Sequence, residues 1–453
     1  MAREKKEKAP KVRKPGYIGA GKFWAWESRE LSDAGFSFLV GYITFYCTDV
    51  MGVSPLIIGA LFAGSKVIDA ITDLLAGYIV DNTNTKLGKG RPYDFCLIGA
   101  WASMVLLFNC PDGWGETAKI VWIVVWYILA NAVFYTFLNA GEKVFMLRTF
   151  DHDQIVKITS QGSLATSLLG LCCGIIVPQL INNAGTDPYA WSSMTIMLAI
   201  PFTIIGLARF AFCREDYDVM AEKKEEKMDM KEVFQLMTKN GYWMLFCMIA
   251  LISNTVSNMG VTVYYFTKVL GNLGLQSIFA GVSALAVIAL VILPKLMKRF
   301  SVQQILMGGL LISALCNLIC FIFYNNVPIL VVCYVLNMAA TVPGVYIVNL
   351  ILYDCALYNE HLGLHRMEGT MGSLNGFMKR CGSALGSLLL GVGLTLIQYD
   401  ADAVTLAPIT FWGLRVMMYG IPLLSAVIQA VLWKFYTLEK QIPAIREELG
   451  ITE

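Results

Sequence analysis

The chain has 453 residues, of which 57% are hydrophobic and 15% are charged, and its formal net charge is +2. A soluble globular protein carries about 25% charged residues, so this composition excludes that class and indicates a protein with many membrane spans. The nearly balanced charge gives no sign of nucleic-acid binding. The informative signal is where Lys and Arg fall along the chain.

The first residues form a basic segment that differs from a signal peptide. Seven Lys and Arg residues lie between positions 3 and 14, and no apolar run follows them directly. We therefore expect residues 1–20 to be a basic cytoplasmic tail. The twelve Cys residues are scattered, mostly in apolar runs, and without metal-ligand spacing, so we interpret them as small buried hydrophobic residues.

Twelve apolar segments follow, and most are long enough to cross a bilayer as a helix. The first is interrupted near its start by Glu27, Arg29, Glu30 and Asp33. A charged stretch, 214–238, separates the first six from the last six and is interpreted as a cytoplasmic linker. We thus predict one half at 21–213, a second at 239–437 and a cytoplasmic tail at 438–453. The predicted spans are 24–50, 54–80, 93–110, 118–141, 156–181, 190–212, 239–268, 274–295, 303–324, 328–355, 370–398 and 408–436.

The connecting segments alternate in charge. Those on the expected cytoplasmic side carry Lys and Arg, whereas those on the other side are nearly free of them, with Lys119 as the exception. The positive-inside rule then predicts that both termini are cytoplasmic, as an even number of spans requires. The basic residues are Lys86, Lys89, Arg91, Arg148, Lys157, Lys223, Lys224, Lys227, Lys231, Lys295, Lys298, Arg299 and Arg366.

The second span carries two acidic residues at membrane depth. Asp69 and Asp73 lie four residues apart and so share one helix face. Two carboxylates about 6 Å apart repel by roughly 3 kcal/mol at an effective dielectric near 20. The pair therefore needs a bound cation, a proton on one member, or a basic residue.

The neighbours of this pair favour cation binding. Thr72 adds a hydroxyl oxygen, and Lys66, three residues before Asp69, would keep Asp69 ionised when no cation is bound. The sequence predicts a site for a small monovalent cation at Asp69, Thr72 and Asp73. A purely structural ion-pair network with Lys66 is the alternative.

A short motif follows at the expected cytoplasmic end of this span. It contains Gly77, Asp81, Gly88, Lys89 and Arg91. Small residues allow close helix approach, and Asp81 is placed to cap neighbouring groups or pair with basic residues. We interpret the motif as a gate latch; for Lys89 and Arg91 the alternative is a simple role in setting topology.

These residues together resemble the signature of the glycoside–pentoside–hexuronide:cation symporter family. The pattern is Asp-Ala-Ile-Thr-Asp at 69–73, then Gly77, Asp81 and Gly-Lys-x-Arg-Pro-Tyr at 88–93. The resemblance implies an all-α membrane protein of twelve transmembrane helices in two six-helix bundles, the major facilitator fold. It also implies cotransport of a sugar-like solute with Na⁺, H⁺ or Li⁺. Supporting similarity lies in Phe45–Gly52, in Asn254, Ser257, Asn258 and 264–266, and in Asp354, Tyr358, Arg366, Glu368 and Gly369.

The resemblance carries over to further residues of the expected cation site. Asp69, Thr72 and Asp73 match the family's cation-binding residues. Thr136 and Asn139 align with a fourth-span segment where the family has Thr and Asp. Asn139 removes one negative charge there but still offers an amide oxygen, so we expect a changed cation or substrate preference.

The resemblance also implies solute contacts. Asp33 aligns with a sugar-binding carboxylate, although a helix-start role is the alternative. In the eleventh span Arg380 or, alternatively, Lys379 aligns with a basic residue that faces the cavity. That residue would pair with Asp33 or bind a carboxylated sugar such as a hexuronide. Tyr346 is a candidate to stack on a sugar ring, with simple packing as the alternative.

We therefore predict a cation-coupled symporter of a sugar, glycoside or hexuronide in the plasma membrane. The alternative is a cation-coupled carrier of a non-sugar solute such as a lysolipid or another organic anion. We find no nucleophile–base set or metal cluster, so we expect no enzyme activity and no cofactor beyond the coupling cation. The expected partners are the solute and the lipid bilayer, with no nucleic acid, and the expected functional unit is a monomer.

Overall fold

The computed structural model describes residues 17–150, 152–215, 239–283, 285, 292–293, 295–363, 368–403 and 405–448. Most of the predicted basic tail and of the predicted linker lies outside these ranges. Within them, helices occur at all twelve predicted spans, and eight helices are long and apolar enough to cross a membrane.

The first half contains the helices of the first six predicted spans. The longest departure from prediction is the fourth span, which continues to Thr149 rather than ending at 141. The elements of the first half are α1 (Ala20–Val40), α2 (Ile43–Phe45), η1 (Tyr46–Val50), α3 (Pro55–Asn82), η2 (Arg91–Phe95), α4 (Cys96–Leu107), α5 (Glu116–Ile128), η3 (Leu129–Tyr135), α6 (Thr136–Thr149), α7 (His152–Ala184), α8 (Pro188–Gly206) and α9 (Ala208–Phe212).

The second half has the same general build. Its elements are α11 (Gly241–Ser257), α12 (Thr262–Tyr264), η4 (Tyr265–Val269), α13 (Leu275–Ser283), α15 (Val302–Ile322), α16 (Val327–His361), α17 (Glu368–Leu396), α18 (Pro408–Arg415), η6 (Val416–Gly420), α19 (Ile421–Lys434), η7 (Leu438–Lys440) and α20 (Ile442–Glu448).

Local chemistry explains where several of these helices begin. Proline, whose fixed φ suits the first helical turn, opens α3, α8 and α18. Ser301 and Gln304 form a capping box at the start of α15, which satisfies two N–H groups that the helix leaves unpaired. Asp187 accepts a hydrogen bond from the Tyr189 N–H at 2.9 Å at the start of α8.

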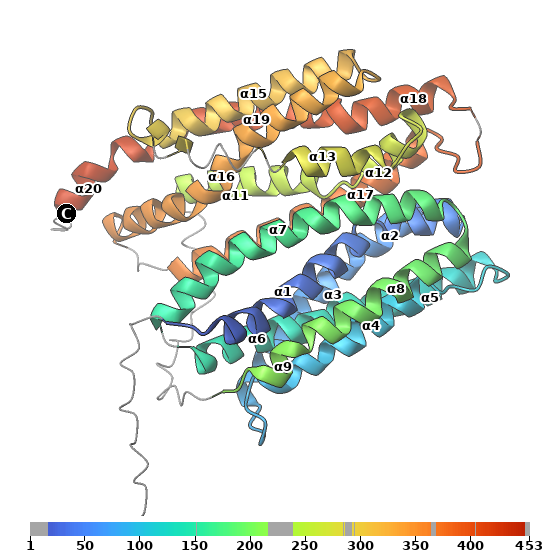
Figure 1. The fold of residues 1–453 in the computed structure, drawn as a ribbon. Helices are drawn as coiled ribbons and strands as arrows, with labels where there is room; N and C mark the ends of the chain where they lie inside the picture. The colour runs from blue at the N-terminus through green and yellow to red at the C-terminus, as the bar shows by residue number, and fades with distance from the viewer. Residues whose placement is uncertain are drawn as a thin grey trace, which may run out of the picture.

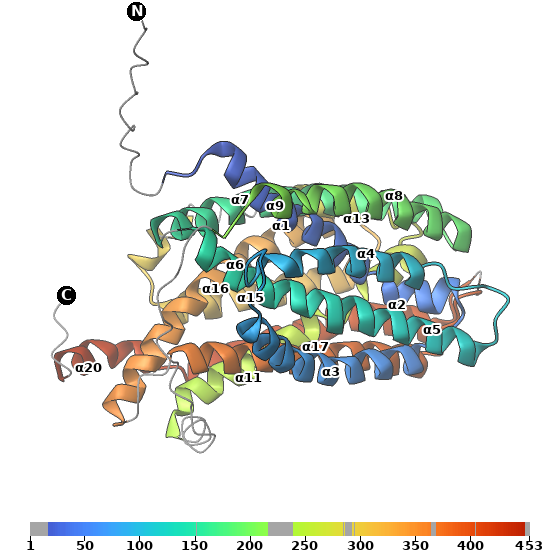
Figure 2. The same cartoon turned by 90° about the horizontal axis from the view of Figure 1, so that it is seen from below.

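The two halves lie against each other, with their helices running along a common long axis (Figures 1 and 2). The start of α1 and the helix α20 lie at one end, which we call the terminal end. The elements α2, α5, α12 and α18 mark the opposite end, which we call the remote end (Figure 1).

One structural element occurs in both halves. The π-helical turns Tyr46–Val50 and Tyr265–Val269 are each followed, two positions later, by a glycine with φ of +68°, Gly52 and Gly271. In both, the N–H after this glycine donates to the carbonyl six positions earlier, at 2.9 and 3.0 Å. Only glycine adopts such a φ at no steric cost, so the two halves share a repeated turn that the sequence analysis did not identify.

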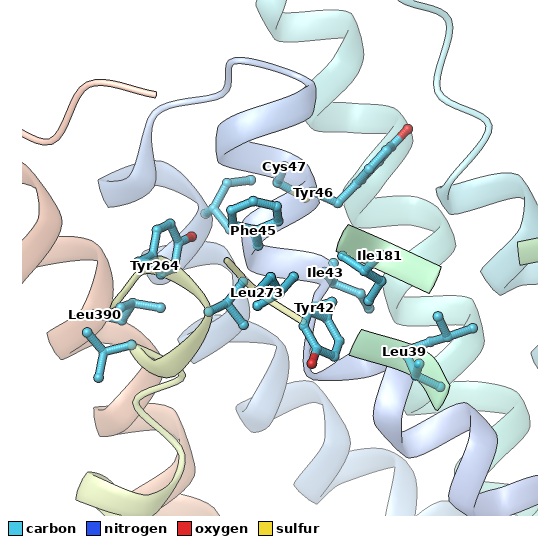
Figure 3. Close-up of a cluster of buried hydrophobic side chains, with 14 of the residues drawn as sticks. Leu39, Tyr42, Ile43, Phe45, Tyr46, Cys47, Ile181, Tyr264, Leu273 and Leu390 are labelled. Atoms are coloured by element: carbon cyan, nitrogen blue, oxygen red, sulfur yellow. The ribbon is translucent and has the colours of Figure 1, made fainter. Parts of the chain in front are cut away.

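Hydrogen bonds between the halves close the remote end. The hydroxyls of Thr48 and Tyr264 lie 2.9 Å apart, and Tyr399 donates to Asp49 at 2.6 Å. Tyr42 adds a bond to Gln276 at 2.8 Å. Apolar side chains from both halves surround these groups (Figure 3), among them Leu39, Ile43, Phe45, Ile181, Leu273 and Leu390.

The segment 438–448, which we expected to be part of a tail, is helical and docked on the second half. Ile442 and Ile445 of α20 are buried. Glu439 accepts from the Val302 N–H at 2.9 Å and so caps the start of α15. His361 and Glu448 lie 2.9 Å apart. Because the segment is rich in charged residues, its sequence gave little sign that Ile442 and Ile445 attach it to the second half.

The helices α3 and α17 come from different halves and touch backbone to backbone near the remote end. A Cβ atom placed on Gly391 would lie 2.5 Å from the Pro55 carbonyl oxygen and 3.0 Å from the Gly59 Cα. Small residues permit this approach, which aligns the two helices along their length.

We predict that Gly391→Ala lowers the stability of the protein in detergent by about 1–3 kcal/mol, because the added methyl group forces the helices apart. Thermal unfolding measures the effect. Gly64→Ala is the matched control, since a Cβ there meets nothing within 4 Å and alanine favours the helix by up to about 1 kcal/mol. Equal melting temperatures of Gly391→Ala and Gly64→Ala would contradict the close contact between α3 and α17.

Candidate functional site

The two carboxylates of α3 each have a basic partner. The Lys66 ammonium lies 3.0 Å from the Asp69 carboxylate, with the side chain of Asp69 only 16% exposed. This contact was predicted from the spacing. The second oxygen of Asp69, Oδ1, is buried and has no hydrogen-bond partner. Such an oxygen is costly to bury, and it is the kind of atom that a cation coordinates.

The partner of Asp73 comes from the other half of the protein. The Arg380 guanidinium of α17 forms an ion pair with the Asp73 carboxylate of α3. The side chains are 49% and 29% exposed, so the pair is accessible to water and ions. The sequence analysis allowed Asp33 or an acidic solute as the partner of this basic residue; in the structure Arg380 pairs with Asp73 and not with Asp33, because the close approach of α3 and α17 places Asp73 opposite Arg380.

The four charges at this position sum to zero. Two carboxylates face one ammonium and one guanidinium, so the expected repulsion is balanced by basic residues. A cation could bind here only by competing with Lys66 or Arg380 for the carboxylate oxygens. Thr72 donates to the Ile68 and Asp69 carbonyls, both at 3.0 Å, and its oxygen keeps lone pairs for a cation. The donor set therefore fits a small hard cation.

The other two predicted cation-site residues lie on α6. Thr136 is buried where η3 joins α6, and it donates to the Asn131 carbonyl at 3.3 Å. Asn139 accepts a hydrogen bond from Arg29 at 2.7 Å through its amide oxygen. In this conformation the amide oxygen of Asn139 is engaged by Arg29 of α1.

A second charged cluster lies inside the first half, and the sequence analysis did not assemble it. Arg29 lies 3.2 Å from Asp33 and 3.6 Å from Glu142. Arg209 lies 3.0 Å from Glu142 and donates to Asp94 at 3.1 Å. Both guanidinium groups are buried. The available signal was the presence of isolated charges within apolar spans, which are costly there unless paired.

This cluster changes the interpretation of Asp33. Its carboxylate pairs with Arg29 and also accepts a hydrogen bond from the Tyr135 hydroxyl. Asp33 is therefore held in place by two neighbours of its own half. A solute that binds Asp33 would have to share it with Arg29 and Tyr135.

The loop that carries the predicted gate residues Lys89 and Arg91 contacts α9 and the residues after it, in the same half. The backbone N–H groups of Lys89, Gly90 and Arg91 all donate to the Glu215 carboxylate at 2.8 Å. The Arg91 guanidinium also donates to the Phe210 carbonyl at 2.7 Å. These contacts tie the loop after α3 to the end of α9. The side chains of Asp81 and Tyr346 lie outside the described part of the structure.

Lys379, the neighbour of Arg380 on α17, faces a different space. It lines an open pocket of about 700 Å³ whose described lining residues belong to the second half, and its side chain is exposed. The sequence left open which of the two residues faces a cavity. In the structure Arg380 reaches across to Asp73, and Lys379 lines the cavity of its own half.

Comparison with known proteins places these features in context. Residues 32–440 match the family described as MFS/sugar transport protein. The chain is 26% identical to a Bacillus subtilis protein named as the uncharacterized symporter YnaJ, over 88% of each chain. It is 24% identical to the isoprimeverose transporter of Lactiplantibacillus pentosus, over 91% of this chain and 88% of the relative.

A solved structure shows the same fold. The crystal structure of a bacterial homolog of the human lysosomal transporter Spinster, inward-facing and unoccupied, superposes with a TM-score of 0.68. The match covers 95% of this chain and 99% of the other at 12% identity. The predicted fold, two bundles of six transmembrane helices, is confirmed.

We predict that Arg209→Met destabilises the protein by about 3–5 kcal/mol, because it leaves the buried Asp94 carboxylate without its partner. Chemical or thermal unfolding in detergent measures the loss. The control is Asp112→Asn, which breaks the pair with Lys119 at 3.3 Å, where Asp112 is 70% exposed; it should cost at most about 1 kcal/mol. If Arg209→Met and Asp112→Asn both lower the free energy of unfolding by only about 1 kcal/mol or less, the buried charged cluster does not stabilise the fold.

Proposed function

The chain belongs to the MFS/sugar transport family, and from this premise we propose that it is a secondary active transporter that couples a cation to the symport of a sugar-like solute. The cation binds at Asp69 and Asp73, and the solute moves by alternating access between the two halves. The observation that carries the proposal is the ion pair between Asp73 and Arg380, which joins the halves at this carboxylate site.

The pair supplies a direct means of coupling. A cation that binds Asp73 replaces Arg380 as its counter-charge, and the ion pair between α3 and α17 is broken, while the contact of Gly391 with Pro55 and Gly59 remains. The released guanidinium then carries an uncompensated positive charge. An anionic or strongly polar group of the solute satisfies that charge, so cation and solute favour each other's binding.

The site chemistry suits Na⁺ and Li⁺, because Asp69, Asp73 and Thr72 offer hard oxygen atoms. A proton carries the same single charge and on Asp73 would also displace Arg380, so the proposal covers H⁺ as well. A bound cation that crosses the membrane electric field gains about 2.3 kcal/mol per 100 mV. This energy would drive accumulation of the solute.

The closed remote end supports alternating access. Among the described residues, the hydrogen bonds between the halves lie at that end, for instance those of Thr48 and Asp49. The distribution of Lys and Arg favours a cytoplasmic terminal end in the plasma membrane. In that orientation the protein is closed to the outside, as expected after solute release to the cytoplasm.

A sugar-like solute is favoured over a lysolipid. The name of the Lactiplantibacillus pentosus relative specifies isoprimeverose, a sugar. In addition, the pocket of the second half has five amide and five hydroxyl side chains among its apolar lining residues, and these can form hydrogen bonds with a hydroxylated solute.

We predict that Asp73→Asn lowers cation affinity by about ten- to a hundredfold, because the variant loses a charge-assisted contact. The assay is uptake of radiolabelled D-glucose, D-xylose and D-glucuronate by proteoliposomes under Na⁺, Li⁺ or H⁺ gradients. The wild type should accumulate at least one sugar under one gradient, and the exposed-site control Asp112→Asn should match it. Uptake that does not depend on any of the three cation gradients, or that is unchanged in Asp73→Asn, would refute the proposal.

A further inference from the structure

The charged cluster of the first half contains more carboxyl groups than basic groups. Its two guanidinium groups, those of Arg29 on α1 and Arg209 on α9, are both buried. If every carboxyl group around them were ionised, three negative charges would have no counter-charge within this set. Such an excess is costly in a buried site unless a positive charge joins it. The carboxyl groups of the cluster are those of Glu27, Glu30, Asp33, Asp94 and Glu142.

Two of these carboxyl groups lie directly against each other. The side chains of Glu30 on α1 and Glu142 on α6 are hydrogen-bond partners. An ionised carboxylate has no hydrogen to donate, so this contact requires a proton on one of the two groups. Glu142 lies 3.0 Å from Arg209 and 3.6 Å from Arg29, whereas Glu30 lies 3.8 Å from Arg29. Glu142 is therefore the better compensated anion, and Glu30 is the member that keeps the proton.

Glu27 is a further carboxyl group of the cluster that lacks a full set of partners. It is 2% exposed, and its Oε2 atom is buried without a hydrogen-bond partner. A Cβ atom on Gly162 of α7 would lie 2.8 Å from the carboxyl carbon of Glu27, so this glycine makes room for the acid. The charged groups near Glu27 are Glu142 and Arg209, and Thr166 of α7 is its hydrogen-bonding neighbour. A proton removes the cost of burying such a carboxylate.

A proton fits this cluster better than a metal ion does. In the part of the chain that the structure describes, no group of three His, Cys, Asp or Glu side chains is arranged to hold a metal ion. The guanidinium groups of Arg29 and Arg209 also occupy the space between the carboxylates and would repel a second cation. A proton needs only one oxygen atom of each carboxyl group.

We propose that the cluster is a proton-binding site of the first half, in which Glu30 and Glu142 share one proton and Glu27 holds a second. The site is separate from the cation site of α3, whose carboxylates are paired with Lys66 and Arg380. It does not depend on the proposed coupling at Asp73.

The groups that surround these protons come from five elements. The helices α1, α6 and α9 approach one another near the terminal end of the first half (Figure 1). The charged and polar groups are Arg29 and Asp33 of α1, Asp94 of η2, Glu142 of α6, Thr166 of α7 and Arg209 of α9.

The two protons differ in their access to water. The side chain of Glu30 is 25% exposed, so the shared proton can exchange with solvent through Glu30. Glu27 is almost fully enclosed, and its proton can leave only when the helices around it separate. The shared proton should therefore exchange faster than the proton of Glu27.

Infrared absorption of the purified full-length protein in detergent tests the site. A protonated carboxyl group has a C=O stretching band that an ionised carboxylate lacks, and this band shifts when deuterium replaces the proton. At neutral pH, Glu30→Gln should remove one component of this absorption and Glu27→Gln another. In wild type transferred to D₂O, the component assigned to Glu30 should shift before the component assigned to Glu27.

Two controls replace acids that need no proton. Asp33 has Arg29 as its counter-charge at 3.2 Å, and Glu116 faces solvent. Asp33→Asn and Glu116→Gln should therefore leave the protonated-carboxyl bands unchanged.

Thermal unfolding shows that the variant used is folded and adds an independent readout. The amide of Gln donates the same hydrogen bond to Glu142 as a protonated carboxyl group does. Glu30→Gln should therefore melt close to wild type, whereas Glu30→Leu, which cannot donate, should melt at a lower temperature. A Glu30→Gln variant that melts as low as Glu30→Leu would contradict the shared proton.

The outcomes separate this inference from the proposed function. Absorption that is unchanged in both Glu30→Gln and Glu27→Gln would overturn the site. A band that is lost in Asp73→Asn but in neither cluster variant would assign the proton to the cation site and also overturn this inference. If both cluster variants lose their bands while uptake depends on no cation gradient, the proton site stands and the proposed coupling fails.

Discussion

The arrangement of this protein depends on neutralising two carboxylates at membrane depth. Asp69 and Asp73 repel each other, and the charge of Asp69 is poorly screened by water because its side chain is only 16% exposed. Lys66 balances Asp69 from the same helix, whereas Arg380 balances Asp73 from the other half. Because Arg380 belongs to the other half, a change in the charge of this site also changes the contact that holds the two halves together.

The two halves meet through repeated geometry as well as charge. The π-helical turns Tyr46–Val50 and Tyr265–Val269 have the same backbone course, yet their polar side chains differ. Asp49 of the first turn accepts from Tyr399 of the other half, whereas Lys268 of the second turn donates to the Ala401 carbonyl of its own half. Such pairs of related elements are typical of halves that arose as repeats, and here they close the remote end.

Sequence reasoning succeeded where partners are local and failed where they are distant. Periodicity and apolar length located all twelve spans, and the spacing of Lys66 and Asp69 was sufficient to predict their contact. The sequence could not predict the contact of Arg380 with Asp73, because that contact depends on how α3 and α17 pack. The cluster of Arg29 and Arg209 was missed for the same reason, since its members come from four separate spans.

The most direct test of the central claim is a Na⁺ titration of purified wild type and Arg380→Gln, read by equilibrium binding. If Arg380 competes with the cation for Asp73, its removal should tighten Na⁺ binding about fivefold, since a partly exposed ion pair contributes about 1 kcal/mol. Weaker or unchanged Na⁺ binding in Arg380→Gln would contradict the account, because Arg380 would then not be the counter-charge that the cation replaces.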